Sequence, residues 1–109
     1  MLHMLSDRYK QGQWRVGTSK EHPYDTDIRV PLLARGPGIQ PGSTYNFPSG
    51  NVDLTPTLLT LAGGSSYVPE FMDGKSMTAF LTPSLERDAE VKMASWRKAF
   101  LNEYMSVGT

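Results

Sequence analysis

The stretch from Lys20 to Gly38 constrains the fold of this chain more than any other part of it. Residues 28–35 are almost continuously apolar, which is typical of a strand covered on both faces of a sheet. Pro31 donates no backbone hydrogen bond, so we expect the strand to be bent or bulged there, or paired on one side only. Gly36-Pro37-Gly38 then ends the strand in a tight turn.

Polar side chains stand directly before this strand, where α/β enzymes often keep their chemistry: Lys20, His22, Tyr24, Asp25 and Asp27. A desolvated lysine attracts sulfate or phosphate strongly, so Lys20 is a candidate oxyanion ligand. Earlier in the loop, the carboxylate of Asp7 would suit Ca²⁺ or Mg²⁺. The structural alternatives are commoner, because a loop lysine is usually solvated and an aspartate after serine usually makes a turn or cap.

Composition narrows the function classes. The chain has 109 residues, enough for one small domain, and a net charge of +0 without a block of like charge. That balance gives no support to a nucleic-acid or membrane-surface role, and no apolar run approaches the roughly 20 residues of a membrane span. With no cysteine, the chain cannot form a disulfide, a thiolate metal site or a cysteine nucleophile.

Residues 51–62 form the best helix candidate. Their apolar side chains recur at the i, i+3, i+4 spacing of one helix face. Asn51 or Asp53 can cap its start, and Gly63-Gly64 is a typical helix end. We expect a structural helix that covers a sheet.

The other expected elements are shorter. The sequence predicts the end of a strand at residues 1–5, a loop at 6–27, a short strand at 43–47, a helical turn at 76–81, and a helix at 85–95 capped by Ser84. Residues 99–105 fit either a helical extension or a terminal strand.

Six groups of residues, taken together and in order, resemble the sulfatase family, above all the branch of the N-acetylglucosamine-6-sulfatases. They are Ser6-Asp7; Gly12-Gln13-Trp14 followed by Lys20; Arg29-Val30-Pro31-Leu32 with Arg35-Gly36-Pro37-Gly38; Asp53-Leu54-x-Pro56-Thr57-Leu58-Leu59; Asp73-Gly74-Lys75-Ser76; and Trp96-Arg97 followed by Asn102-Glu103-Tyr104.

The resemblance implies part of an α/β, alkaline-phosphatase-like sulfatase fold, with the strand, the covering helix and a C-terminal strand at residues 99–105. Residues 1–83 would be the C-terminal part of the catalytic domain. Residues 84–109 would be the helix and strand that begin the C-terminal subdomain.

The resemblance also implies an activity: a sulfuric ester hydrolase acting on sulfated amino sugars of glycosaminoglycans, such as N-acetylglucosamine 6-sulfate. Lys20 would contact the sulfate and Asp7 would bind calcium. The implied partner is a sulfated saccharide rather than nucleic acid or a membrane, and the implied compartment is lysosomal or secreted.

The sequence departs from the family's pattern, and the N-terminal acidic pair that holds the metal in the family is absent from it. Asp7-Arg8-Tyr9-Lys10 lacks the family's second calcium ligand, and no Cys/Ser-x-Pro/Ala-x-Arg motif supplies the formylglycine nucleophile. We therefore expect an N-terminal part of the same domain to be missing and the chain alone to be inactive. The alternatives are a truncated, non-catalytic remnant and a phosphoester hydrolase of the same superfamily.

Overall fold

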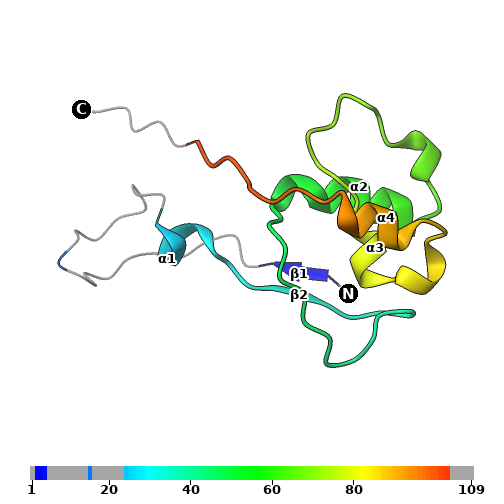
Figure 1. Ribbon diagram of the computed structural model, residues 1–109, viewed down its shortest axis with the longest axis horizontal. Helices are drawn as coiled ribbons and strands as arrows, with labels where there is room; N and C mark the ends of the chain where they lie inside the picture. Colours follow the sequence, from blue (N-terminus) through cyan, green and yellow to red (C-terminus); the bar gives the residue numbers. More distant parts are fainter. Residues whose placement is uncertain (1, 5–14, 16–23, 104–109) are drawn as a thin grey trace. The chain divides into compact units, whose positions relative to one another are not determined.

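The computed structural model describes residues 2–4, 15 and 24–103 (Figure 1). The chain forms two compact units. The first comprises Met1–Leu33 and Leu101–Thr109, and the second comprises Ala34–Phe100. Each is described by itself below.

The first unit contains a two-stranded sheet in which β1 (Leu2–Met4) pairs with β2 (Leu32–Ala34), whose last residue belongs to the second unit. The strand expected at residues 1–5 is thereby confirmed. Between the strands, α1 (Asp25–Ile28) is a single helical turn. The backbone N–H of Arg29 closes this turn on the carbonyl oxygen of Asp25 at 2.9 Å.

The strand predicted at residues 28–35 is wrong in its extent, because regular pairing begins only at Leu32. Pro31 explains the late start: it donates no hydrogen bond, and its ring restricts the residue before it. Leu33 is 67% exposed, so burial on both faces is also wrong for the described strand.

In the second unit, the helix predicted at residues 51–62 is confirmed. A 3-10 turn, η2 (Asn51–Asp53), leads directly into α2 (Leu54–Leu61). Pro56 lies in the first turn, where its missing N–H costs no helical hydrogen bond. Gly63, with φ +82°, ends the helix in the left-handed conformation that glycine adopts readily. The sheet lies in the other unit, so the covering role of α2 stays a prediction.

The rest of the second unit consists of short elements that gather beside α2 (Figure 1). They are η3 (Ser65–Tyr67), α3 (Thr78–Leu81), η4 (Pro83–Leu85) and α4 (Ala89–Ala94). The helical turn expected at 76–81 is confirmed as α3. The apolar core is built from side chains below 9% exposed: Met77, Ala79, Phe80, Leu81 and Ala89.

The predicted helix at 85–95 is wrong at its start. Pro83 opens a separate 3-10 turn, Glu86 is extended (φ −107°, ψ 118°), and the helix begins only at Ala89. Residues 99–103 and 43–47 form no strand; residues 104 and 105 lie outside the described residues.

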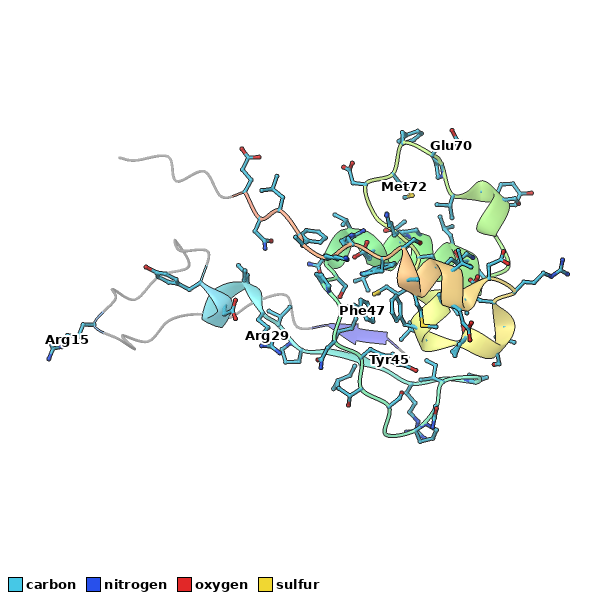
Figure 2. All side chains as sticks on the ribbon, in the orientation of Figure 1. Arg15, Arg29, Tyr45, Phe47, Glu70 and Met72 are labelled. Carbon is cyan, nitrogen blue, oxygen red and sulfur yellow. The ribbon has the colours of Figure 1, made fainter. Side chains whose placement is uncertain are left out.

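An aromatic cluster accounts for the segment at 43–47. Phe47 stacks on Phe80 of α3 with ring centroids 3.9 Å apart, and Trp96 meets both rings edge-on at 5.3 and 5.1 Å. Tyr45, labelled with Phe47 in Figure 2, meets Phe80 at 6.1 Å. The indole N–H of Trp96 donates to the carbonyl oxygen of Pro48 at 2.9 Å. The segment is therefore held by its side chains rather than by a strand ladder.

Candidate functional site

The two residues that the sequence singles out for chemistry, Asp7 and Lys20, lie outside the described residues, as does His22. Their assignments stay predictions. Of their described neighbours, Tyr24 is 55% exposed and Asp25 of α1 is exposed as well.

The part of the chain that the structure describes contains no group of three His, Cys, Asp or Glu side chains able to hold a metal ion. Of its helices, none has the length and apolar character that crossing a bilayer requires.

The described residues do form a polar cluster around the carboxylate of Asp53, which is 0% exposed. Its Oδ2 accepts the backbone N–H of Gly50 at 2.9 Å and Nη1 of Arg97 at 2.8 Å. Its Oδ1 accepts the backbone N–H of Lys75 at 2.7 Å and Nη2 of Arg97 at 2.8 Å. One carboxylate thus joins the turn before α2, the segment after the Asp73-Gly74 turn, and the residues that follow α4. We call this group the Asp53 hub.

Arg97 neutralises the buried charge of the Asp53 hub. Its guanidinium meets the carboxylate in a two-pronged pair, the geometry in which arginine binds carboxylates best. The same group lies 5.0 Å from the ring centre of Trp96 and 4.9 Å from that of Phe100, and its side chain is 14% exposed. Two aromatic faces therefore stabilise the cation while excluding water from it.

The chemistry available to Asp53 follows from these contacts. Each carboxylate oxygen already accepts two hydrogen bonds, so neither has a lone pair directed at a metal or a substrate proton. Asp53 therefore positions backbone segments and is not a candidate ligand or general base.

A second contact fixes the same segment one turn further along α2. The buried hydroxyl of Thr57 donates to the carbonyl oxygen of Asp53 and accepts the backbone N–H of Met77 at 2.9 Å. Gly74 permits this close approach, because a Cβ there would lie 1.9 Å from the carbonyl oxygen of Val52. Any larger residue would force the two segments apart.

The Asp53 hub unites three motifs recognised separately in the sequence: Asp53-Leu54-x-Pro56-Thr57, Asp73-Gly74-Lys75-Ser76 and Trp96-Arg97. Sequence reasoning expected Asn51 or Asp53 to cap the helix, but the side chain of Asp53 makes no cap bond to α2. It instead accepts the N–H of Gly50, the N-cap of η2, as the third residue of a capping box does. It missed the pairing with Arg97, since no local pattern marks a partner 44 residues away.

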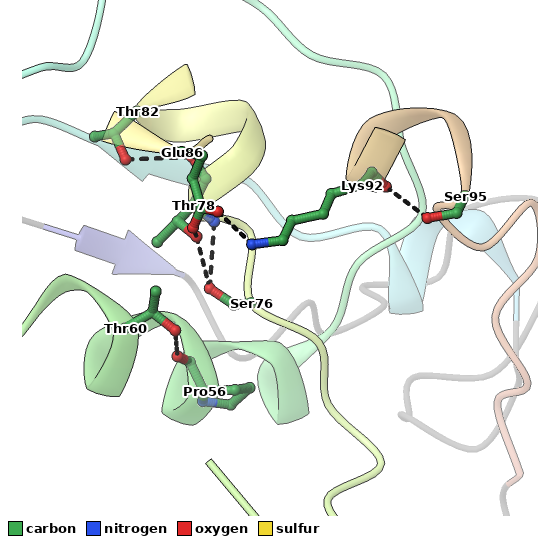
Figure 3. Close-up of polar contacts among 8 residues, drawn as sticks. All are labelled: Pro56, Thr60, Ser76, Thr78, Thr82, Glu86, Lys92 and Ser95. Atoms are coloured by element: carbon green, nitrogen blue, oxygen red, sulfur yellow. Dashed lines mark hydrogen bonds and ion pairs between the residues drawn. The ribbon is translucent and has the colours of Figure 1, made fainter. Parts of the chain in front are cut away.

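A second polar cluster lies around Glu86, between η4 and α4 (Figure 3). Its carboxylate accepts the hydroxyl of Thr78 and pairs with the ammonium of Lys92. The hydroxyls of Ser76 and Thr78 lie 2.9 Å apart. Hydrogen bonds from Lys92 and then Thr78 lower the pKa of Glu86 below its ordinary value of 4.5, although burial acts in the opposite direction.

Comparison with known proteins shows which family these motifs represent. The chain is 38% identical over 108 residues to an N-acetylglucosamine-6-sulfatase of Bos taurus and 39% identical to that of Homo sapiens. It is 40% identical over 95 residues to the "Extracellular sulfatase SULF-1 homolog" of Drosophila melanogaster.

These alignments cover 99% of the chain for the first two relatives and 87% for the third. The chain spans only 18% of the length of each N-acetylglucosamine-6-sulfatase and 8% of the Drosophila protein. No family model and no solved structure matches the chain.

Proposed function

The chain belongs to the sulfatase family, and we propose that the intact protein carrying it hydrolyses sulfate esters. The observation that supports this most is the similarity over nearly the whole chain to relatives that are themselves named sulfatases. The homology equally implies an alkaline-phosphatase-like fold, of which these residues would form a part.

As substrate we propose a sulfated amino sugar of a glycosaminoglycan, such as N-acetylglucosamine 6-sulfate. Support comes from the names of the bovine and human relatives. The proposed compartment is lysosomal or secreted, in keeping with a relative named as extracellular. The proposed substrate is tested by measuring how fast the intact protein releases sulfate from N-acetylglucosamine 6-sulfate. Release of phosphate from N-acetylglucosamine 6-phosphate is measured alongside. Preferential phosphate release would refute it in favour of a phosphoester hydrolase.

Lys20 is our proposed sulfate contact. Its ammonium would stabilise the charge on the sulfate oxygens during attack, a contribution worth about 10²–10³ in rate when one such donor is removed. We expect Lys20→Ala in the intact protein to lower kcat/KM by about that factor and Lys20→Arg to retain part of the activity. Lys98→Ala, which removes an exposed lysine of the other unit, is the matched control. Unchanged turnover in Lys20→Ala would exclude Lys20 from the site.

Asp7 is our proposed calcium ligand. A carboxylate oxygen suits Ca²⁺, but the ion takes six to eight oxygen ligands. One aspartate can supply only part of such a shell, so Asp7 would share the ion with other oxygen ligands. Calorimetric titration of the intact protein with Ca²⁺ tests the assignment. Asp7→Asn should weaken binding at least about tenfold, and equal affinity in the two proteins would refute the role of Asp7.

A further inference from the structure

Glu86 occupies the corner where three elements of the second unit meet. It directly follows η4, its carboxylate accepts a hydrogen bond from α3, and it pairs with a cation of α4 (Figure 3). Its side chain is 11% exposed, whereas that of its partner Lys92 is 53% exposed. The carboxylate therefore lies at the edge of the core, with one partner inside and one facing solvent.

The inner partner depends on the ionised carboxylate. Thr78 is 3% exposed, and its hydroxyl donates to Glu86 while lying 2.9 Å from the hydroxyl of Ser76. If Glu86 were protonated, it would lose much of its strength as an acceptor, and a buried donor left without a good acceptor is costly. The charge on Glu86 thus satisfies a group within the core as well as one at the surface.

The charged groups around Glu86 make Lys92 its main electrostatic partner. Residues 78–81 of α3 include no titratable side chain, so that side offers only hydroxyls. On the other side, α4 contributes Lys92 and the exposed Glu90, and the intervening segment contributes Arg87 and Asp88, both exposed. No described contact joins Glu86 to these last three residues.

We propose that ionised Glu86 acts as a latch that holds α4 against α3 through Lys92 in the last turn of α4, and that protonating Glu86 opens this corner of the protein. The geometry supplies the mechanism: the proton removes the ion pair with Lys92 and weakens the acceptor for Thr78 in one step.

The direction of the pKa shift sets the pH range of this latch. Because the pKa of Glu86 is lowered on folding, its stabilisation is fully present above the ordinary value of 4.5 and is lost as pH falls through the lower, folded value. The latch therefore stays closed in mildly acidic solution and opens at lower pH than an unpaired glutamate would allow.

Amide hydrogen exchange of the 109-residue chain, followed by NMR, tests the proposal. The probe is the N–H of Lys92 in α4, which donates to the carbonyl oxygen of the N-cap residue Asp88 at 3.0 Å. The reference is the N–H of Ala62 at the end of α2, bonded to Leu58 at 3.0 Å. The ratio of the two rates, corrected for intrinsic exchange, isolates opening of α4 from global unfolding.

In the wild type we expect this ratio to stay constant from pH 7 to 4.5 and to rise below that. In Glu86→Gln the ratio should be at least about tenfold higher than in the wild type at pH 7, because the variant loses hydrogen bonds to a charged group. The ratio in this variant should also be independent of pH. Glu90→Gln, which removes an exposed acid of α4, should behave as the wild type does. A ratio in Glu86→Gln within twofold of the wild type would overturn the proposal, as would wild-type opening centred at or above pH 4.5.

If Glu86→Gln also loses protection at Ala62, the variant has unfolded globally and Lys92→Gln decides the question. This variant removes the largest cause of the lowered pKa while leaving Thr78 in place. Its opening midpoint should therefore move upward toward pH 4.5, and an unmoved midpoint would overturn the latch.

Discussion

Replacing Asp53 by asparagine tests the Asp53 hub directly, because the substitution keeps the shape of the side chain and removes its charge. The guanidinium of Arg97 would remain 14% exposed between two aromatic rings with no carboxylate to pair with. One amide oxygen would also have to serve the N–H groups of Gly50 and Lys75, which now have one carboxylate oxygen each.

Removing one partner of a buried ion pair typically costs about 3–5 kcal/mol. A domain of this size is stable by about 5–15 kcal/mol in total, so Asp53→Asn should remove about a fifth or more of that stability. The melting temperature should fall by about 12 °C or more, at about 4–8 °C per kcal/mol. Urea unfolding followed by circular dichroism gives the free-energy change.

Two further variants make this test specific. Asp73→Asn removes an exposed carboxylate of a neighbouring motif and should change stability by less than about 0.5 kcal/mol. Arg97→Met leaves the carboxylate without its partner, whereas Asp53→Asn leaves the cation without its partner. The double variant Asp53→Asn/Arg97→Met should therefore lose clearly less stability than the sum of the two single variants. A cost below about 1 kcal/mol for Asp53→Asn, or strict additivity, would refute our reading of the hub.

Three other substitutions probe the contacts around the hub, each by the same unfolding measurement. Gly74→Ala should cost about 3 kcal/mol, because the added Cβ would lie 1.9 Å from the carbonyl oxygen of Val52. Gly63→Ala should cost less, about 1–2 kcal/mol, because it adds only the strain of a left-handed φ of +82° in open space. A larger cost for Gly63→Ala than for Gly74→Ala would contradict the close approach at Gly74. Thr57→Val should cost about 1–3 kcal/mol, because it leaves the buried N–H of Met77 without its acceptor. Thr57→Ser keeps the hydroxyl and should retain most of that stability. Equal costs for the Val and Ser variants would show that the hydroxyl is not responsible. Trp96→Phe should cost about 1–2 kcal/mol, because it removes the hydrogen bond from the indole N–H to the carbonyl oxygen of Pro48. Tyr67→Phe, at an exposed position, is the matched control. An equal or smaller cost for Trp96→Phe than for Tyr67→Phe would refute a stabilising role of this hydrogen bond.

The elements that the sequence predicts well are those governed by neighbouring residues. The helix at 51–62 has its tolerated Pro56 and its terminal glycine within one short window, and both appear in the structure. The apolar stripe predicts the helix but not its buried face, because Leu58 and Leu61 are 54% and 45% exposed and the buried residues of α2 are Pro56 and Thr57. The helical turn of α3 is similarly local. Where these signals agree, a sequence pattern is enough.

The elements predicted wrongly are those decided by distant partners or by one proline. Pro31 delays the strand to Leu32 against a continuous apolar run. Phe47 packs on Phe80, 33 positions further along the chain, so the segment before α2 needs no strand partner. Glu86 engages Thr78 and Lys92 instead of joining the first turn of a longer helix.

The candidate site shows the same division. The family motifs contain Asp53, Lys75 and Arg97, but the meeting of Lys75 and Arg97 at the Asp53 carboxylate depends on contacts that span 22 and 44 residues. Periodicity and propensity carry no information about such contacts. Asp7 and Lys20 lie outside the described residues, so their roles stay predictions.

The spacing of the donors to Asp53 also bears on the order in which the second unit folds. Gly50 lies three residues away, Lys75 lies 22 and Arg97 lies 44. Doubling the length of a loop adds only about 0.6 kcal/mol to the entropic cost of closing it. The contact between Asp53 and Arg97 therefore forms late in folding, but its loop length lowers the stability of the folded state only slightly. We expect the turn before α2 to form first, the segment after Gly74 to dock next, and the arginine to close the structure last. The ion pair would then act chiefly on the rate of unfolding.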